Sequence, residues 1–395
     1  MSDHRAVCAD NLAVLPQIND QSVDLIYIDP PYNTGRSRNY CDTFQDWVGF
    51  MRPRLTQAHR TLAMTGVIAV AIGDEEHPRL RLLMDEIFGE ANRLSTLVWA
   101  GPSHGNAAFC AGGIDYTLVY ARSRRALVDS GVRWREPDEN VTAMLEAASR
   151  AWGETSDRDR AQADYRAWWR DYKRSHDTAP GLDTYRHLDE AGRLYRVDNL
   201  QAPDSSGARS TRALIHPNGN PCPVPSRGWY YTDKMMDSKL TENRIAFGKD
   251  HTTIPGLIRY LADTGGRAPS PLILHPRNDS RHLGHILGRK GFDAPKDHQV
   301  LMRLIGRMAG PEATVLDFFA GSGSTGEAVM RLNAADGGRR RAILVTNDEG
   351  SIFTDVLMPR LNTLVTGIRP DGSRYGVGLG QSWSFSSDLQ DEIAA

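Results

Sequence analysis

The stretch VLDFFAGSGSTGEAVMRLN, residues 315–333, decides the fold class of this chain. It begins as an apolar strand that carries one acidic residue, Asp317, and then enters a turn of small residues, 320–323. The two glycines of this turn permit positive φ and let the backbone approach a ligand closely. The helix that follows, from near Ser324, favours a negative group at its start. This order predicts a cofactor site in a parallel α/β sheet, although the loop alone also fits a plain strand–helix turn.

The next predicted strand, RAILVTN at residues 341–347, narrows the choice of cofactor. An acidic or polar group at the tip of this strand is the expected acceptor for ribose hydroxyls, with Glu349 as first choice and Asn347 as second. A buried Asp317 would need a partner, for which a cationic amino-acid group is suitable. These features favour S-adenosylmethionine. They disfavour ATP, because the spacing is not GxxxxGK[ST], and NAD, because nothing else in the chain indicates hydride chemistry.

A second motif, VDLIYIDPPYNTG at residues 23–35, ends a predicted strand on Asp29, Pro30, Pro31 and Tyr32. Side chains at the carboxyl end of a parallel strand line the ligand crevice. The prolines stiffen the turn and remove backbone donors, so the Asp29 carboxylate and nearby carbonyls can accept both hydrogens of a planar exocyclic amine. The Tyr32 ring is expected to offer a flat face beside them. The amine nitrogen could then attack a sulfonium methyl directly. A Pro-Pro turn with an incidental tyrosine is the alternative.

These motifs resemble those of the amino-group DNA methyltransferases, which modify N6 of adenine or N4 of cytosine. DPPY resembles their catalytic motif, and DFFAGSGST resembles their S-adenosylmethionine loop. The catalytic motif comes first, as in the beta class of the family, which is a circular permutation of the same sheet. Further stretches, such as GFDAPKDHQVLMRLI at residues 291–305, resemble the modification subunits of type III restriction systems.

The resemblance implies a full set of site residues. Asp10 would lie near the cofactor adenine, and residues 292–296 would line its methionine end. The catalytic residues are expected to be Asp29, Pro30, Pro31 and Tyr32. The cofactor-binding residues are expected to be Asp10, Phe292, Lys296, Asp317, Phe319, Ala320, Gly321, Ser322, Gly323, Ser324, Thr325, Asn347 and Glu349.

The predicted fold is a doubly wound, mostly parallel, seven-stranded α/β sheet of the methyltransferase type, circularly permuted, with an inserted target-recognition region. Apolar runs predict strands at 5–10, 23–29, 66–72 and 116–121, all expected to be parallel, and further strands at 314–320 and 340–347. Helical spacing predicts helices at 76–89 (apolar face Leu80, Leu83, Met84 and Ile87) and 298–308 (Val300, Leu301, Leu304, Ile305 and Met308). The expected domains are 1–121, an insertion at 122–270, and 271–395.

The insertion is the predicted region for reading double-stranded DNA, because loops carried by a rigid sheet often hold the recognition residues. A formal net charge of −2 means that local basic patches would have to hold the phosphates. Aromatic residues stand among arginines here, and either base contacts or plain packing would explain them: Trp168, Trp169, Trp229, Tyr230 and Tyr231.

Other site classes are disfavoured. The four cysteines, Cys8, Cys41, Cys110 and Cys222, form no CxxC pair, so neither a zinc knuckle nor a disulfide framework is expected. No metal site is expected at His282 and His285, because no acidic ligand set accompanies them. No apolar run reaches the length of a membrane span and no signal pattern opens the chain, so a cytoplasmic protein is expected.

The predicted function is adenine-N6 methylation of a specific duplex DNA sequence by base flipping and direct transfer. By family habit, aspartate rather than serine at position 29 favours adenine. Cytosine-N4 methylation, a specificity or modification subunit of a type III-like restriction complex, and an RNA or protein amine acceptor remain alternatives. A homodimer and a helicase-nuclease restriction subunit stay open as partners.

Overall fold

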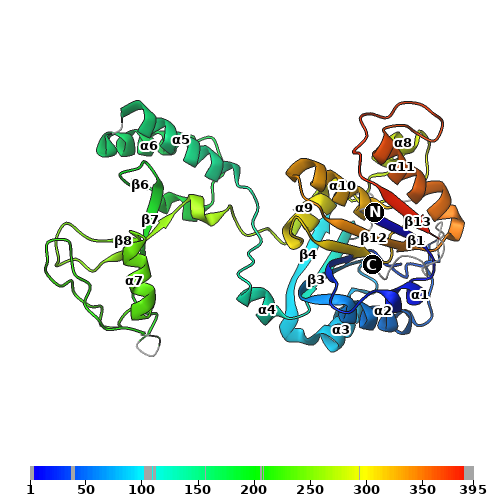
Figure 1. Cartoon of the computed structure of the whole chain (residues 1–395), viewed down its shortest axis with the longest axis horizontal. Helices are drawn as coiled ribbons and strands as arrows, with labels where there is room; N and C mark the ends of the chain where they lie inside the picture. The colour runs from blue at the N-terminus through cyan, green and yellow to red at the C-terminus, as the bar shows by residue number, and fades with distance from the viewer. Residues whose placement is uncertain are drawn as a thin grey trace. The chain divides into compact units, whose positions relative to one another are not determined.

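The computed structural model of the chain divides into two compact units (Figure 1). Unit 1 comprises residues 1–134 and 270–395, and unit 2 comprises residues 135–269. The predicted boundary at 122 falls earlier than this division, because α4 (Arg124–Asp129) packs on the sheet of unit 1. The structure describes residues 4–36, 41–101, 109, 113–155, 157–204, 207, 209–292 and 294–386. Cys110 lies outside these residues.

Unit 1 is built on a sheet that has nine strands within the described residues, in the order β10-β4-β5-β3-β2-β11-β12-β1-β13. Six of these strands correspond to the six runs predicted as strands, and β4 is the seventh strand of the expected sheet, which no predicted run covers. One short strand more lies at each edge, β10 and β13, whose few residues give no clear periodicity. The strands are β1 (His4–Cys8), β2 (Val23–Ile28), β3 (Leu62–Ile72), β4 (Arg93–Ala100), β5 (Ile114–Ala121), β10 (Leu272–Leu274), β11 (Thr314–Asp317), β12 (Arg341–Thr346) and β13 (Trp383–Ser386).

One predicted strand direction is wrong. The run at 116–121, expected to be parallel, belongs to β5, which is antiparallel to both β3 and β4. β4 and β5 follow each other along the chain and pair directly, as antiparallel strands can without a crossover helix. β5 is buried on both faces in the middle of the sheet, so its apolar sequence looks like that of a parallel strand.

Helices cover both faces of the sheet, which confirms the doubly wound α/β class. Along β2, Ile26 and Ile28 face a core shared with α1, α2 and α3, whereas Leu25 and Tyr27 face a core shared with α9 and α10. The helices of unit 1 are α1 (Asn11–Val14), α2 (Trp47–Thr61), α3 (His77–Met84), α4, α8 (Ser280–Leu287), α9 (His298–Met308), α10 (Ser324–Asp336) and α11 (Met358–Thr366). Short 3₁₀ or π turns lie at Leu15–Gln17, Asp85–Gly89, Glu90–Asn92, Glu349–Ser351 and Phe353–Leu357.

The chain winds in opposite directions from the two strands at the centre of the sheet. β2 leads to β3 on one side and β11 leads to β12 on the other, while β2 and β11 pair with each other in parallel. Ligand crevices of doubly wound sheets form at such a reversal, outside the carboxyl ends of the strands. The DPPY turn after β2 and the glycine turn after β11 therefore lie at the same edge, although their sequence positions are far apart.

The two predicted helices differ in accuracy. The helix at 298–308 has the predicted bounds, and its apolar face is buried except for Met308, which is partly buried. The helix at 76–89 changes to a π turn at Asp85–Gly89. A π turn adds one residue to the helical repeat, so Phe88 is buried where Ile87 was expected, and Ile87 is only partly buried.

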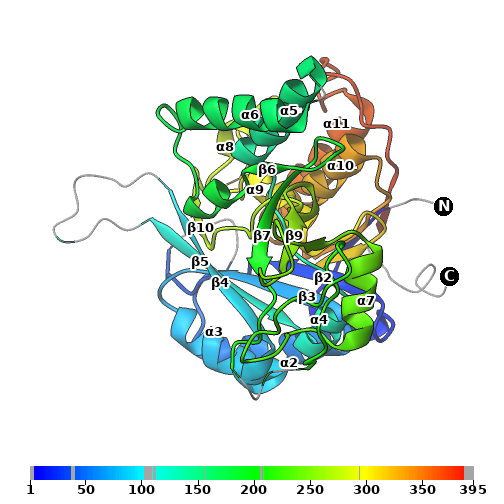
Figure 2. The same cartoon turned by 90° about the vertical axis from the view of Figure 1, so that its left-hand side faces the viewer.

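Unit 2 contains a four-stranded antiparallel sheet in the order β6-β7-β9-β8. Helices α5 and α6 pack against each other next to this sheet (Figure 2). Its elements are α5 (Glu139–Thr155), α6 (Arg158–Tyr172), β6 (His187–Leu188), β7 (Leu194–Asn199), α7 (Asp233–Thr241), β8 (Ile245–Ala246) and β9 (Gly256–Tyr260), with 3₁₀ turns at Pro180–Thr184 and Ala262–Thr264. Among the helices of the described residues, none has the length and apolar character needed to cross a bilayer.

Candidate active site

A cavity opens in unit 1 at the carboxyl ends of β2 and β11. Its empty volume, mouth included, is about 1130 Å³, which is ample for a nucleoside-sized ligand. Three residues of the predicted site do not line it: Pro30, Tyr32 and Gly323. The predicted residues that do line it are Asp10, Asp29, Pro31, Phe292, Lys296, Asp317, Phe319, Ala320, Gly321, Ser322, Ser324, Thr325, Asn347 and Glu349.

The corner of the cavity at Asp29 contains three hydrogen-bonded polar side chains, Asp29, Tyr32 and Lys296. The Tyr32 hydroxyl donates to Asp29 Oδ1 at 2.8 Å, and Lys296 Nζ donates to the Tyr32 oxygen at 2.7 Å. Lys296 Nζ also lies 3.3 Å from Asp29 Oδ1 and 4.8 Å from the centre of the Tyr32 ring. Tyr32 thus anchors the carboxylate through its hydroxyl.

The Tyr32 ring is not part of the lining of this cavity, and the flat face expected beside the amine stays a prediction. Tyr32 is partly buried against the apolar core, and a Cβ added at Gly73 would lie 2.9 Å from its Cδ2. The glycine therefore makes room for the ring. The hydroxyl contacts with Asp29 and Lys296 then fix its direction.

Lys296 is held by a second carboxylate, Asp115, at the start of β5. Lys296 Nζ donates to Asp115 Oδ2 at 2.8 Å, and Arg277 Nη1 donates to Asp115 Oδ1 at 2.6 Å. Burial tends to raise the pKa of Asp115, but Lys296 and Arg277 outweigh it and lower that pKa. Burial raises the pKa of Asp29, against an opposing effect of Lys296. The lysine ammonium therefore favours the ionised form of the Asp29 carboxyl.

Asp317 lies deeper, at the end of β11. Its Oδ1 accepts the N–H of Phe319 at 3.0 Å, and its Oδ2 accepts the Thr325 hydroxyl at 2.6 Å. Burial and, to a smaller extent, the nearby Asp29 raise the pKa of Asp317 to about 7 despite these two hydrogen bonds. A carboxyl in this state gains from a cationic ligand, because the cation removes the cost of ionising a buried acid.

The glycine turn is supported from below by a fully buried ion pair. Arg360 on α11 bonds Glu327 on α10 through Nε, at 2.8 Å, and both side chains are 0% exposed. Arg360 Nη1 also donates to the Ser322 carbonyl at 3.1 Å and to Ser324 Oγ at 2.9 Å. Together with His282, Arg360 lowers the pKa of Glu327 well below its usual range and outweighs the effect of burial. The shape of the turn thus depends on residues that do not touch the cavity.

Gly323 has the predicted positive φ but does not line the cavity. It has φ +80° and forms the N-cap of α10, and a Cβ there would lie 3.3 Å from Leu357 Cγ. Glycine is needed here because the backbone is left-handed, a conformation that residues with a Cβ disfavour, and because the core leaves little room for a Cβ. Gly321 also has positive φ, +48°, and it lines the cavity beside Phe292.

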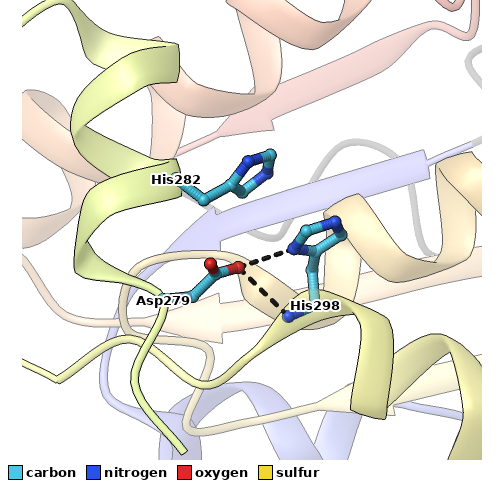
Figure 3. Close-up of side chains that lie close together, drawn as sticks. All are labelled: Asp279, His282 and His298. Carbon is cyan, nitrogen blue, oxygen red and sulfur yellow. Dashed lines mark hydrogen bonds and ion pairs between the residues drawn. The ribbon is translucent and has the colours of Figure 1, made fainter. Parts of the chain in front are cut away.

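Asp279, His282 and His298 form a cluster of two histidines and an aspartate (Figure 3). The cluster lies beside the ion pair of Arg360 and Glu327. His282 pairs with His298 rather than with His285: their rings stack with centres 4.0 Å apart. His298 Nδ1 lies 2.6 Å from Asp279 Oδ2, and His282 Nε2 donates to Glu327 Oε1 at 2.7 Å. One nitrogen of each ring is therefore already used, and the cluster extends the hydrogen-bond network that holds α8, α9 and α10 together.

The opposite end of the cavity combines polar and aromatic groups. Asp10 caps α1 by accepting the N–H of Leu12 at 2.8 Å, and its Oδ2 lies 3.6 Å from Arg54 Nη2. The Arg54 guanidinium lies 3.7 Å from the centre of the Phe50 ring. The sequence reasoning missed Phe44, Phe50, Arg54 and Asn11, all of which line the cavity. Their signal is weak, since Phe50 and Arg54 merely share one face of α2 at i, i+4 spacing.

Residues after DPPY that were not predicted hold this turn in place. Asn33 has φ +60°, and its side chain accepts the N–H of Phe44 at 2.7 Å and donates to Glu76 Oε1 at 2.8 Å. Asp42, which is buried, accepts the N–H of Asn33 at 2.9 Å. Trp47 Nε1 donates to the Pro31 carbonyl at 2.7 Å. The turn is therefore pre-organised without any ligand.

In unit 2, most of the aromatic residues flagged in the sequence belong to the core. Trp229 is fully buried and donates to the Arg212 carbonyl at 2.8 Å, and Trp169 is buried and donates to Asp183 at 3.0 Å. Tyr230 differs, because it is exposed and the Arg209 guanidinium lies 5.4 Å from the centre of its ring. Packing therefore explains both of these buried tryptophans.

Comparison with known proteins places the chain in a family. The sequence model of the N6 and N4 DNA methylase family matches residues 23–352. The chain therefore belongs to the DNA methylase family, as the two motifs predicted. S-adenosylmethionine is the cofactor of this family, which confirms the cofactor expected from the glycine turn. The lining fits it, because it combines a glycine turn, a buried acid and a polar strand tip.

Two relatives show how far the similarity extends. The Mod subunit of the type III restriction-modification enzyme EcoP15I from Escherichia coli is 28% identical over 88% of this chain. That alignment covers 59% of the Mod subunit, so the chain spans less than two thirds of its length. The type II methyltransferase M.KpnI from Klebsiella pneumoniae is 29% identical over 86% of this chain and 79% of its own length.

Solved structures with a similar arrangement include the cytosine-N4-specific PvuII DNA methyltransferase. It is 10% identical, with a TM-score of 0.43, over 88% of this chain and 83% of its own. The M1.HpyAVI–SAM complex is 11% identical, with a TM-score of 0.41, over 91% of this chain and 98% of that one.

Proposed function

We propose that the chain transfers the methyl group of S-adenosylmethionine to the exocyclic N6 of adenine in a specific duplex DNA sequence. The observation that carries the proposal is that Asp29 and Asp317, on adjacent parallel strand ends, line one cavity. A catalytic carboxylate and a cofactor-binding acid must lie this close for direct transfer between two bound ligands.

Asp29 receives the target amine in this proposal. Its carboxylate accepts one hydrogen of the amine, which turns the nitrogen lone pair toward the methyl donor. Tyr32 and Lys296 fix the position of Oδ1 through their own contacts with it, so Oδ2 is the oxygen turned to the amine. Bound S-adenosylmethionine supplies an electrophilic methyl group. The adenine reaches this corner only after it has been flipped out of the duplex.

The remaining lining residues hold the cofactor. Asp317 faces the α-ammonium of the cofactor, and Gly321 and Phe292 contact its methionine end. Glu349, with Asn347 as the alternative, accepts hydrogen bonds from the ribose hydroxyls. Glu349 Oε1 also accepts the N–H of Cys41 at 2.8 Å, which orients its carboxylate. All of these residues line the cavity.

The affinity for S-adenosylmethionine is expected to rise about fivefold between pH 6 and pH 7. In the free protein the Asp317 carboxyl, with a pKa of about 7, keeps its proton through most of this range. The cofactor ammonium prefers the carboxylate, so binding releases this proton and strengthens as the pH rises, by about fivefold if only the ionised form binds.

Isothermal calorimetry at several pH values measures this change, and buffers of different ionisation enthalpy count the released proton. Asp317→Asn is the control, because it should bind more weakly and show a flat profile over the same range. A wild-type affinity that falls as the pH rises would contradict the assignment of Asp317 to the ammonium.

Adenine is preferred to cytosine because of the aspartate at position 29, and similarity to Mod subunits agrees with this preference. Cytosine is the second candidate, since it too has an exocyclic amine. The test is mass spectrometry of nucleosides from duplex DNA treated with protein and cofactor. N6-methyladenine is expected. Detection of N4-methylcytosine instead would identify cytosine as the acceptor. Methylation of RNA or protein in preference to duplex DNA would overturn the proposal.

Sequence recognition is assigned to unit 2, and its exposed Tyr230 with Arg209 is the first pair to test there. Because both type III Mod subunits and a type II enzyme resemble the chain, it either acts alone or joins a restriction subunit. Sequencing modified adenines in cells that express the chain alone would separate these cases. A methylated motif is expected without any partner.

A further inference from the structure

Tyr27 is a buried residue of β2 that no motif assigned to the site. Its side chain is 2% exposed and lines the cavity. It precedes Asp29, the residue directly after β2, by two positions, so the alternation of the strand directs it to the same face of the sheet. In the parallel pairing, Ile26 lies opposite Leu316, which brings Tyr27 opposite Asp317.

The Tyr27 hydroxyl is buried and makes no hydrogen bond with any residue that the structure describes. Buried polar groups nearly always have a partner, and one left unsatisfied is unfavourable. The hydroxyl reaches the polar floor of the cavity through a ring that packs in the apolar core. Such an atom marks the position where a ligand supplies the missing partner.

The charges around the hydroxyl select the kind of ligand group. Burial raises the pKa of Tyr27 well above its usual value, and Asp29, Asp317 and Asp115 raise it further. The phenol is therefore neutral, and its oxygen lies in an environment made negative by carboxylates. A neutral hydroxyl oxygen in such a place accepts a hydrogen bond from a cation more readily than it receives an anion.

The geometry points to Tyr27 as a cofactor-binding residue whose oxygen accepts a hydrogen bond from the α-ammonium of S-adenosylmethionine, next to Asp317. This inference rests on the proposed function and adds a residue to it. Asp317 provides the charge for the ammonium, and Tyr27 provides a second, neutral acceptor. Tyr27 and Asp317 lie on the neighbouring strands β2 and β11, where the chain changes its direction of winding across the sheet.

The test removes the hydroxyl with Tyr27→Phe, which keeps the ring, and measures binding by calorimetry with two probes. S-adenosylhomocysteine carries the amino-acid group and is expected to bind about tenfold more weakly to the variant, equivalent to about 1.4 kcal/mol. 5′-Methylthioadenosine lacks the amino-acid group and is expected to bind both proteins equally. In the absence of either probe, thermal unfolding of the variant should occur no lower than in the wild type, because an unsatisfied hydroxyl has been removed.

Tyr120→Phe is the matched control. Its ring is also fully buried in the sheet, but its hydroxyl donates to Asp85 at 2.6 Å and it does not line the cavity. This variant should lose stability and keep the affinity for both probes.

Three results would overturn the inference. They are unchanged affinity of Tyr27→Phe for S-adenosylhomocysteine, an equal loss for both probes, and a loss of the same size in Tyr120→Phe. A wild-type protein that binds neither probe would overturn the proposed function as well, so the two failures are distinguishable.

Discussion

Replacement of Asp29 by asparagine is expected to lower the rate of methyl transfer by about 10³-fold or more, the scale of removing a pre-organised charged contact at a reacting centre. Asparagine has the same shape but no charge, and its NH₂ group would present donors to an amine that itself donates. The change also leaves Lys296, 3.3 Å from Asp29 Oδ1, with one carboxylate fewer. Binding of S-adenosylmethionine should change little, because the contacts proposed for the cofactor are made by other residues, Asp317, Gly321, Phe292 and Glu349.

The rate is best measured in a single turnover with a radiolabelled methyl group, since slow product release would otherwise hide the loss. Asp24→Asn is the matched control on the same strand. Asp24 lies near the opposite end of β2 and accepts the N–H of Thr314 at 2.8 Å, a contact that asparagine can keep. An Asp29→Asn rate within tenfold of the wild type would remove Asp29 from the catalytic role.

Asp29 and Asp317 could be found from the sequence for a local reason. Asp29 ends an apolar strand and is followed at once by two prolines. Asp317 lies within an apolar strand that leads into a turn with two glycines. The rule that ligands bind at the carboxyl ends of parallel strands then brings them to one edge. The pairing of β2 with β11 completes that inference.

Asp115, which holds Lys296, and Arg277, which bonds Asp115, could not be found in this way. Asp115 lies at the start of β5, before unit 2 in the sequence, and Arg277 follows β10, after unit 2. The two side chains nevertheless bond each other. Their meeting depends on β5 being antiparallel in the middle of the sheet, and a fully apolar run carries no information about its direction. An error in one strand direction thus concealed two charged residues of the site.

Aromatic residues in basic surroundings were ambiguous for a different reason. A tryptophan that packs in a core and one that stacks on a base have the same neighbours in the sequence, because arginines flank both. Trp229 is resolved only by its tertiary contacts, a buried ring and a bond from Nε1 to the Arg212 carbonyl. Tyr32 is similar, since its hydroxyl contacts, and not its sequence position, determine the direction of its ring.

Replacement of Arg360 by methionine is expected to destabilise unit 1 by about 3–5 kcal/mol, the usual result of removing one partner from a buried ion pair. Glu327 would keep His282 and Arg331 as partners but would lose the guanidinium that shares its burial. The Ser322 carbonyl and Ser324 Oγ would lose their donor at the same time. The glycine turn should loosen, so S-adenosylmethionine should bind more weakly even where the variant remains folded.

Differential scanning calorimetry of the full chain measures the stability, and titration with cofactor well below the unfolding temperature measures the affinity. Arg339→Met is the control, because Arg339 is an exposed residue paired with Glu312 and should contribute less than about 1 kcal/mol. The double variant Arg360→Met, Glu327→Gln removes the isolated charge, so it should recover part of the stability but not the cofactor affinity, since Ser322 and Ser324 remain without their donor. Recovery of both would mean that Arg360 only neutralises Glu327, whereas recovery of stability alone would identify it as the residue that shapes the turn.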